Sequence, residues 1–193
     1  MVLFPDGQRL AYFETDPETG RDLWTLPLDT TDPDHPKAGK PEAFLRTPAN
    51  ELFPRFSPDG RWIAYRSDES GTREIYVRPF PAGGRAKWRI STSGAWFAFW
   101  SNHSRELFYE TADNRIMVMD YKVSGDSFQP GKWRLWSGNQ IFNPGLSTLD
   151  LAPDGKRFAV LALRETTSGG NGSVRAILIE NFFDELRRRI IAK

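Results

Sequence analysis

The sequence predicts an all-β protein, a partial β-propeller of about four four-stranded blades followed by a short C-terminal helix. A Pro-Asp-Gly turn leading into a short apolar strand recurs along the chain. The copies lie roughly 45–55 residues apart, which is the length of one propeller blade. Gly and Pro recur at intervals typical of short strands joined by turns. We therefore expect blades over residues 1–180 and a capping helix and tail over 181–193.

The second copy of the repeat is the clearest. In its turn, Pro58 presets φ, Asp59 can accept hydrogen bonds from nearby backbone N–H groups, and Gly60 tolerates a positive φ. The following strand, residues 61–67, is apolar almost without interruption. Such a run is typical of a strand covered on both faces, as in a blade packed between two neighbours. Residues 52–56, 74–78 and 88–91 complete the expected blade.

The other copies follow the same order of turn and strand. The expected strands are 10–14, 23–26 and 43–45 in the first copy, 96–100, 106–110, 116–121 and 133–136 in the third, and 148–151, 158–163 and 174–179 in the fourth. Residues 29–42, rich in Pro, Asp and Lys, are expected to form an exposed excursion. The third copy has Asn-His-Ser at 102–104, which predicts a looser turn. The predicted turn residues are Asp6, Gly7, Pro58, Asp59, Gly60, Pro153, Asp154 and Gly155.

The C-terminal segment carries the signals of a helix. Asn181 is a plausible N-cap, with acidic residues near the expected start and arginines near the end. Phe182, Phe183 and Leu186 would give the helix a narrow apolar face. We expect this face to dock on the last blade and cover it, as capping elements do in repeat proteins.

Composition excludes several classes of function. The 26 Lys and Arg residues and the 25 Asp and Glu residues give a net charge of +1, which offers no long-range attraction for nucleic acid or an anionic membrane. The absence of cysteine excludes disulfides and thiolate sites. No apolar run reaches the roughly 20 residues of a membrane span. The N-terminus lacks the pattern of a signal peptide and opens directly into a repeat, so we expect the chain to be one end of a longer protein.

No set of residues has the pattern of a catalytic or metal site. His35 lies in the polar excursion and His103 in the degenerate turn, where a solvated loop residue is the simpler interpretation. The carboxylates at 29, 32 and 34 lack the glycine and the terminal Glu of a calcium loop. The aspartates of the Pro-Asp-Gly turns are expected to serve their own turns. We therefore predict no catalytic residues, no metal and no cofactor.

Ligand binding is better supported than catalysis. The first strand of each propeller blade lines the central channel, and ligands usually bind at the channel mouth and the loops around it. The predicted ligand-binding residues on this geometry are Asn50, Glu51, Arg55, Trp96 and Asp150. Trp96 could present an aromatic face to a peptide or a sugar, although a Trp wedged between blades is the competing interpretation.

The repeat resembles that of the TolB-like, WD-repeat-like propeller family, in which a Ser-Pro-Asp-Gly turn is followed by Ile-Ala-Tyr and Ile-Tyr-Val strands. The segments that match most closely are 57–60, 63–65 and 75–77. The ending Ile-Glu-Asn-Phe-Phe-Asp-Glu-Leu at 179–186 is similar to the C-terminal ends of certain bacterial serine/threonine protein kinases. That resemblance implies a kinase domain and a membrane span before the propeller, and an extracytoplasmic location. No kinase motif occurs in this chain.

These observations predict a non-catalytic binding or scaffold module of a larger bacterial protein, such as a membrane-anchored serine/threonine kinase. The expected partner is a protein or peptide, with a small ligand as an alternative, and neither nucleic acid binding nor membrane insertion is expected. One other hypothesis is the propeller part of a hydrolase or oligopeptidase. Another is a half-propeller that self-associates, because about four blades close poorly and a homodimer would complete the ring.

Overall fold

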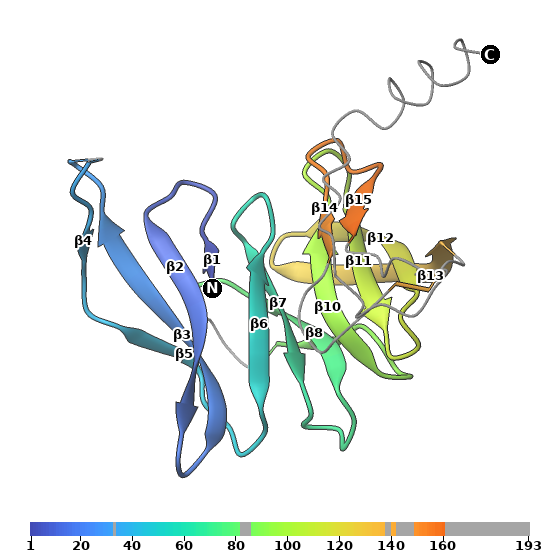
Figure 1. The fold of residues 1–193 in the computed structure, drawn as a ribbon, viewed down its shortest axis with the longest axis horizontal. Coiled ribbons are helices and arrows are strands. Elements are labelled where there is room, and N and C mark those ends of the chain that lie inside the picture. Colours follow the sequence, from blue (N-terminus) through green and yellow to red (C-terminus); the bar gives the residue numbers. More distant parts are fainter. Residues whose placement is uncertain (33, 82–85, 138–139, 142–148, 161–193) are drawn as a thin grey trace, which may run out of the picture.

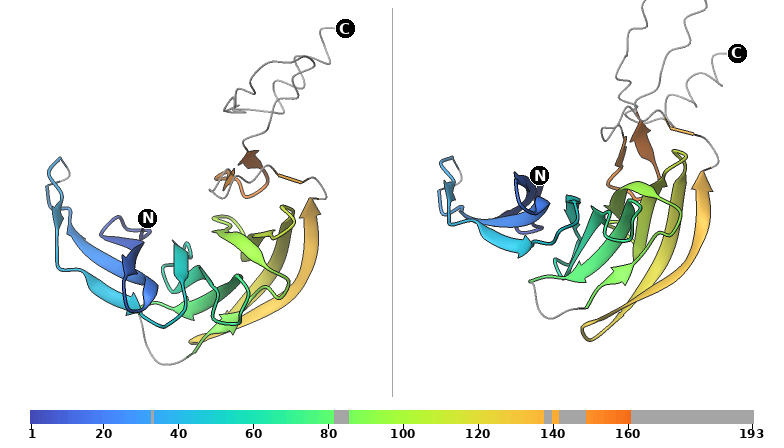
Figure 2. Two further views of the ribbon diagram at one scale, coloured as in Figure 1. Left: turned by 60° about the horizontal axis from the view of Figure 1, so that its bottom comes forward. Right: turned by 90° about the horizontal axis from the view of Figure 1, so that it is seen from below.

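The computed structural model describes residues 1–32, 34–81, 86–137, 140–141 and 149–160. Over these residues the regular elements are antiparallel β-strands, grouped in sheets that stand side by side in an arc (Figures 1 and 2). The all-β class and the blade organisation are therefore confirmed. The expected strand 174–179 and the expected helix over 181–193 lie outside the described residues.

The first blade has the strand order β1-β2-β3-β5, and β4 pairs with the far end of β3. Its strands are β1 (Val2–Leu3), β2 (Arg9–Asp16), β3 (Gly20–Asp29), β4 (Lys37–Ala38) and β5 (Glu42–Leu45). β2 and β3 are longer than the sequence predicts, because their ladder continues to the turn glycine Gly20. Part of the predicted excursion, Lys37–Ala38, is a short exposed strand.

The second and third blades are four-stranded meanders in chain order. The strands of the second blade are β6 (Glu51–Phe56), β7 (Trp62–Ser67), β8 (Glu74–Pro79) and β9 (Trp88–Arg89). Those of the third blade are β10 (Ala95–Trp100), β11 (Glu106–Thr111), β12 (Ile116–Ser124) and β13 (Ser127–Ser137). The last strand of the third blade is much longer than the predicted 133–136, because a turn at Gly125, with φ +55°, folds β12 directly back into β13.

The fourth blade is described as a single hairpin, β14 (Leu149–Leu151) and β15 (Phe158–Val160). It lies next to β10 of the third blade. The first strands β1, β6 and β10 run along the concave side of the arc, and the long β13 lies on the convex side (Figure 2). The blades are therefore ordered as in a propeller, with the first strand innermost.

The central strands bury side chains on both faces. Ile63 and Tyr65 belong to the apolar cluster shared with the first blade, whereas Trp62 and Ala64 belong to the cluster shared with the third. All four side chains are at most 1% exposed. Because successive side chains of a strand point to opposite faces, one uninterrupted apolar run fills two interfaces between blades. This explains the absence of polar alternation in the run that begins at Trp62.

The turn glycines also allow neighbouring blades to approach closely. Gly60 has φ +68°, and a Cβ added to it would lie 2.4 Å from Cζ of Phe4 in the first blade. Gly155 has φ +65°, and its Cβ would lie 2.7 Å from Oγ of Ser101 in the third blade. Gly7 has φ +75° but nothing within 4 Å of such a Cβ. Two of these glycines are thus required by packing as well as by backbone conformation.

The degenerate third turn is closed by side chains. The turns at Gly7, Gly60 and Gly155 each donate the glycine N–H to the carbonyl three residues earlier, at 2.9 Å. In the third copy, Ser101 Oγ instead accepts hydrogen bonds from the backbone N–H groups of His103, at 3.3 Å, and Ser104, at 3.2 Å. A serine hydroxyl therefore takes the place of the backbone turn bond.

Candidate functional site

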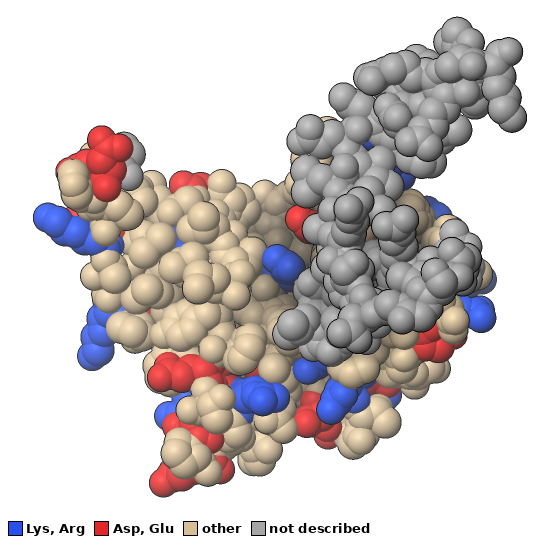
Figure 3. Space-filling view, viewed as in Figure 1, with Lys and Arg blue, Asp and Glu red and all other residues tan. Residues whose placement is uncertain are grey.

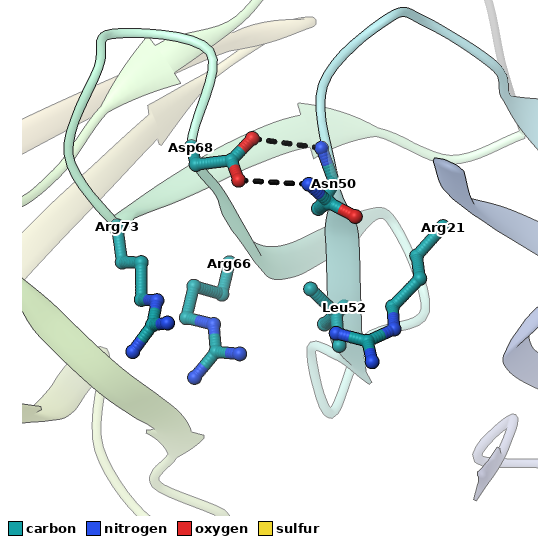
Figure 4. A pocket seen from close by; sticks show the side chains of 6 residues that line it. All are labelled: Arg21, Asn50, Leu52, Arg66, Asp68 and Arg73. Atoms are coloured by element: carbon teal, nitrogen blue, oxygen red, sulfur yellow. Dashed lines mark hydrogen bonds between the residues drawn. The ribbon is translucent and has the colours of Figure 1, made fainter. Parts of the chain in front are cut away.

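A polar hollow opens at one end of the first two blades. This end, which we call the junction face, carries the turns 17–19 and 68–73 and the connections between blades, 46–50 and 91–94; it lies at the bottom of Figure 1. The hollow measures about 100 Å³. The residues that line it are Arg21, Asn50, Leu52, Arg66, Asp68 and Arg73 (Figure 4).

Arg66 is the most unusual of these residues. It lies near the end of β7, in a strand whose six residues are all buried, and it is itself only 7% exposed. Its guanidinium carbon lies over two aromatic rings, 4.6 Å from the ring centre of Phe53 and 5.4 Å from that of Trp96. Its Nε is buried and has no hydrogen-bond partner among the described residues. A buried cation normally has a carboxylate partner. Arg66 forms no ion pair with the described residues, so its charge is stabilised here chiefly by the two rings.

The two rings are placed by irregularities of the inner strands. The pairing of β6 with β7 shifts between Leu52 and Arg55, and that of β10 with β11 shifts between Ala95 and Ala98. Phe53 lies inside the first of these bulges, at φ 53°, a conformation that is rare outside glycine. Bulges change the direction of side chains and are frequent beside binding sites. The bulges thus account for the two aromatic side chains that reach Arg66.

Two further arginines surround the hollow. Arg73 is exposed and its guanidinium carbon lies 5.1 Å from the ring centre of Trp96. Arg21 is exposed at the start of β3 in the first blade. Figure 4 shows Arg66 and Arg73 extended in the same direction with their guanidinium groups adjacent, and Arg21 reaching toward Leu52 from the other side. Three cationic groups from two blades thus converge on one small space.

The positive charge of the hollow is only partly balanced. Asp68 is the one carboxylate among the lining residues, and its two oxygens accept hydrogen bonds from Asn50, from the backbone N at 2.8 Å and from Nδ2 at 2.9 Å. Burial lowers the pKa of Arg66 to about 10, and the nearby charges of Arg73 and Arg21 lower it too, against a weaker opposing effect of Asp68. The positive field of the hollow therefore exceeds what its own carboxylate neutralises.

Glu51 is adjacent in sequence but closed off from solvent. Its side chain is fully buried, and Oε1 accepts a hydrogen bond of 2.5 Å from the Thr47 hydroxyl. Its other oxygen has no partner among the described residues. Burial raises the pKa of Glu51 to about 7, and the nearby carboxylates of Asp22, Glu69 and Asp68 contribute in the same direction. Glu51, set between the first two blades, is therefore mostly protonated below neutral pH and about half ionised near pH 7.

The predicted binding residues do not form a single group. Asn50 lines the hollow and Trp96 borders it through its contacts with Arg66 and Arg73. Arg55 lies farther along β6, with its guanidinium over the ring of Phe99 at 5.7 Å. Asp150 is exposed on β14, where its carboxylate accepts a hydrogen bond from the N–H of the next residue. Neither of these two residues lines the hollow.

Sequence reasoning did not identify Arg21, Arg66, Asp68 and Arg73, although the sequence carries a signal for three of them. Arg66 is a charge inside an apolar strand, and burying a charge costs free energy of folding unless it is paired, so such a residue is a candidate for a binding role. Arg21 is one residue after the turn glycine Gly20, near the start of β3, and Arg73 is two residues after Gly71, immediately before β8. A comparison of the repeats position by position would have placed these two cations on the same end of adjacent blades.

The turn aspartates are engaged locally. The carboxylates of Asp6, Asp59 and Asp154 each accept a hydrogen bond from the backbone N–H two residues later, at 2.7, 3.1 and 3.0 Å. His35 is exposed and contacts Asp32 at 3.1 Å. Within the described ranges, no three His, Cys, Asp or Glu side chains are grouped so as to hold a metal ion. The same residues include no helix with the length and apolar character of a membrane span.

Comparison with known proteins supports the fold. The chain matches no protein-family model and no curated protein sequence. A candidate 6-phosphogluconolactonase from Bacteroides uniformis is 14% identical with a TM-score of 0.54, over 90% of this chain and 52% of that one. A candidate TolB from Agrobacterium tumefaciens is 22% identical with a TM-score of 0.49, over 69% and 48%. TolB from Acinetobacter baumannii is 17% identical with a TM-score of 0.43, over 87% and 49%.

These likenesses concern the backbone. At 14% identity, the first shows a common fold and carries no reaction or substrate to this chain. TolB proteins are among the solved structures that resemble the chain, as the repeat motif predicts. The chain spans about half the length of each structure it matches. The order of the described blades and the likeness with a TM-score of 0.54 together support a β-propeller fold.

Proposed function

We propose that this chain is a non-catalytic β-propeller binding module, the interaction region of a larger bacterial protein, and that it holds a protein or peptide partner on its junction face. The observation that carries the proposal is the hollow around Arg66, where a buried guanidinium that has no carboxylate partner among the described residues opens toward solvent beside Trp96. Leaving such a group unpaired costs free energy of folding, so its presence favours a role in binding.

The scaffold suits this role. Three apolar clusters join the blades into a rigid base, while the candidate site is formed by strand ends and turns at one edge. Binding residues are commonly carried by loops that a rigid framework positions. The segment 179–186, through its resemblance to the ends of bacterial serine/threonine kinases, supports a place for the module in a sensor or scaffold protein of that kind.

The proposal can be tested by selecting peptides and locating where they bind. Displayed random peptides are selected on the immobilised protein, and a synthetic copy of a selected peptide is titrated into the labelled protein while backbone amide NMR signals are recorded. We expect shifts concentrated in 46–50, 68–73 and 91–94. Shifts concentrated at the opposite end of the blades, in 57–61 and 125–126, or the failure of any peptide to bind, would contradict the proposal.

A further inference from the structure

The charge in the hollow points to the chemistry of its ligand. The lining residues carry three guanidinium groups against one carboxylate, and that carboxylate is held by Asn50. Arg66 and Arg73 lie next to one another, with the Trp96 ring 5.4 Å from one and 5.1 Å from the other (Figure 4). Adjacent like charges repel, and the repulsion is strongest where one of them is buried. An anion between them would remove this repulsion and would accept the hydrogen bonds that the guanidinium groups still have to donate.

The size of the hollow restricts that anion. Sites for drug-sized ligands and cofactors measure roughly 300–1,000 Å³. A hollow of about 100 Å³ admits one small planar or tetrahedral group and not a sugar or nucleotide ring. The group must also enter from the side that Arg21 and Arg73 leave open to solvent, because Leu52 and Arg66 are buried.

The surroundings favour a singly charged group over a polyanion. Charged side chains of both signs mix along the lower edge of the molecule in Figure 3, and the whole chain carries a net charge of only +1. Asp68 lines the hollow itself. Highly charged ligands such as nucleic acid bind through extended basic surfaces with a long-range positive field. A carboxylate meets the planar donors of arginine with matching geometry and needs no such field.

We propose that the hollow is a carboxylate-binding pocket for a peptide partner, with Arg66 as its fixed donor and Arg21 and Arg73 as the solvent-facing donors that close around the bound group. This inference rests on the proposed function and adds the chemical class that the junction face recognises. The rings of Phe53 and Trp96 both contact the Arg66 guanidinium, so this donor group is held in position before the ligand arrives. Preorganisation of this kind reduces the entropy lost on binding.

The first experiment uses acetate as the probe and acetamide as the uncharged control of the same shape. The arginine Nε–Hε NMR signals of the intact protein are recorded during each titration. We expect acetate to shift the signals of Arg66 and Arg73 in a saturable way and acetamide to leave them in place. Arg61 is the internal control, because it precedes the same strand at its opposite end and contacts Asp126. Equal shifts at Arg61, or none at Arg66, would overturn the inference.

Variants of the arginines keep the test independent of folding. Arg66→Gln removes the buried donor, and Arg73→Gln removes an exposed donor whose loss the fold tolerates more easily. Each should weaken acetate binding by about tenfold, the effect of losing one charge-assisted hydrogen bond. Arg61→Gln should bind acetate as the unchanged protein does. Unaltered acetate affinity in Arg73→Gln would count against the pocket even where Arg66→Gln fails to fold.

The selected peptides show whether a terminal or a side-chain carboxylate binds. They also distinguish failure of this inference from failure of the proposed function. Each peptide is made with a free or an amidated C-terminus, and with its acidic side chains changed to Asn or Gln. Loss of binding on amidation identifies the terminal carboxylate, and loss on the side-chain changes identifies an acidic side chain. Peptides that bind the junction face equally well in all forms would refute the carboxylate inference and leave the proposed function standing.

Discussion

The paired glycines of the first two turns allow the contribution of blade packing to be measured separately from that of backbone conformation. Gly60 and Gly7 have nearly the same φ, +68° and +75°, but only Gly60 is covered, with Phe4 Cζ 2.4 Å from the position of an added Cβ. A positive φ costs an alanine about 1–2 kcal/mol. Overpacking a well-filled contact adds about 1–3 kcal/mol. We therefore expect Gly7→Ala to lower the free energy of unfolding by about 1–2 kcal/mol and Gly60→Ala by about 2–5 kcal/mol.

The assay is urea denaturation followed by tryptophan fluorescence. Trp62 follows the Gly60 turn, is 1% exposed and packs edge-on against Trp88, so it is one of the seven tryptophans whose emission changes when the blades unfold. The Phe4 ring also packs against Phe56 at 4.9 Å, so Phe4→Ala has a cost of its own. In the double variant Phe4→Ala with Gly60→Ala the clash is absent. The two changes should therefore be less damaging together than the sum of their separate effects.

Two outcomes would refute this reasoning. Equal costs for Gly7→Ala and Gly60→Ala would mean that packing on the second turn contributes nothing. Strictly additive effects of Phe4→Ala and Gly60→Ala would mean that the ring of Phe4 does not limit the space at Gly60. Either result would place the first blade differently against the second.

The remaining predictions concern three buried residues, namely Glu51, Phe128 and Ser57. Because burial raises the pKa of Glu51 from 4.5 to about 7, ionising it opposes folding. The free energy of unfolding of the wild type, relative to that of Glu51→Gln, should therefore fall by up to about 3 kcal/mol as the pH rises from below 4.5 to above 7. A difference between the two proteins that does not change with pH in urea titrations would contradict this. Phe128→Ala should cost about 3–5 kcal/mol in thermal or urea unfolding, since its ring contacts four other aromatic rings. Ser57→Ala should lower the free energy of unfolding by about 1–3 kcal/mol, because it removes the hydroxyl that accepts a hydrogen bond from the buried backbone N–H of Trp62. Ser70→Ala, at an exposed turn, should be near neutral in the same assay.

Much of the fold could be predicted because its signals are local. A Pro-Asp-Gly turn sets backbone angles within four residues, and an apolar run such as 62–65 indicates coverage on both faces without reference to distant parts of the chain. The strand lengths were less accessible. β13 runs from Ser127 because Gly125 closes a hairpin, although the segment is largely polar and exposed and so carries little apolar pattern.

The site was harder to predict because it depends on long-range geometry. Trp96 and Arg66 are 30 positions apart, and they meet only because adjacent blades pack face to face and a bulge turns the indole inward. Asn50 was predicted from its place before a first strand, which is a local property. The convergence of Arg21 with Arg73 requires the angle between two blades, which no single segment encodes.

The contacts at the glycine turns give the array a direction. Phe4 lies against Gly60 and Ser101 lies against Gly155, so in these two pairs the first residue of one turn packs on the glycine of the next turn along the chain. Changing the order of the blades would place different side chains against Gly60 and Gly155 and leave other turn glycines without a covering side chain. Gly7 has no such side chain within 4 Å, so a blade packed against this edge would have to supply the side chain that covers it.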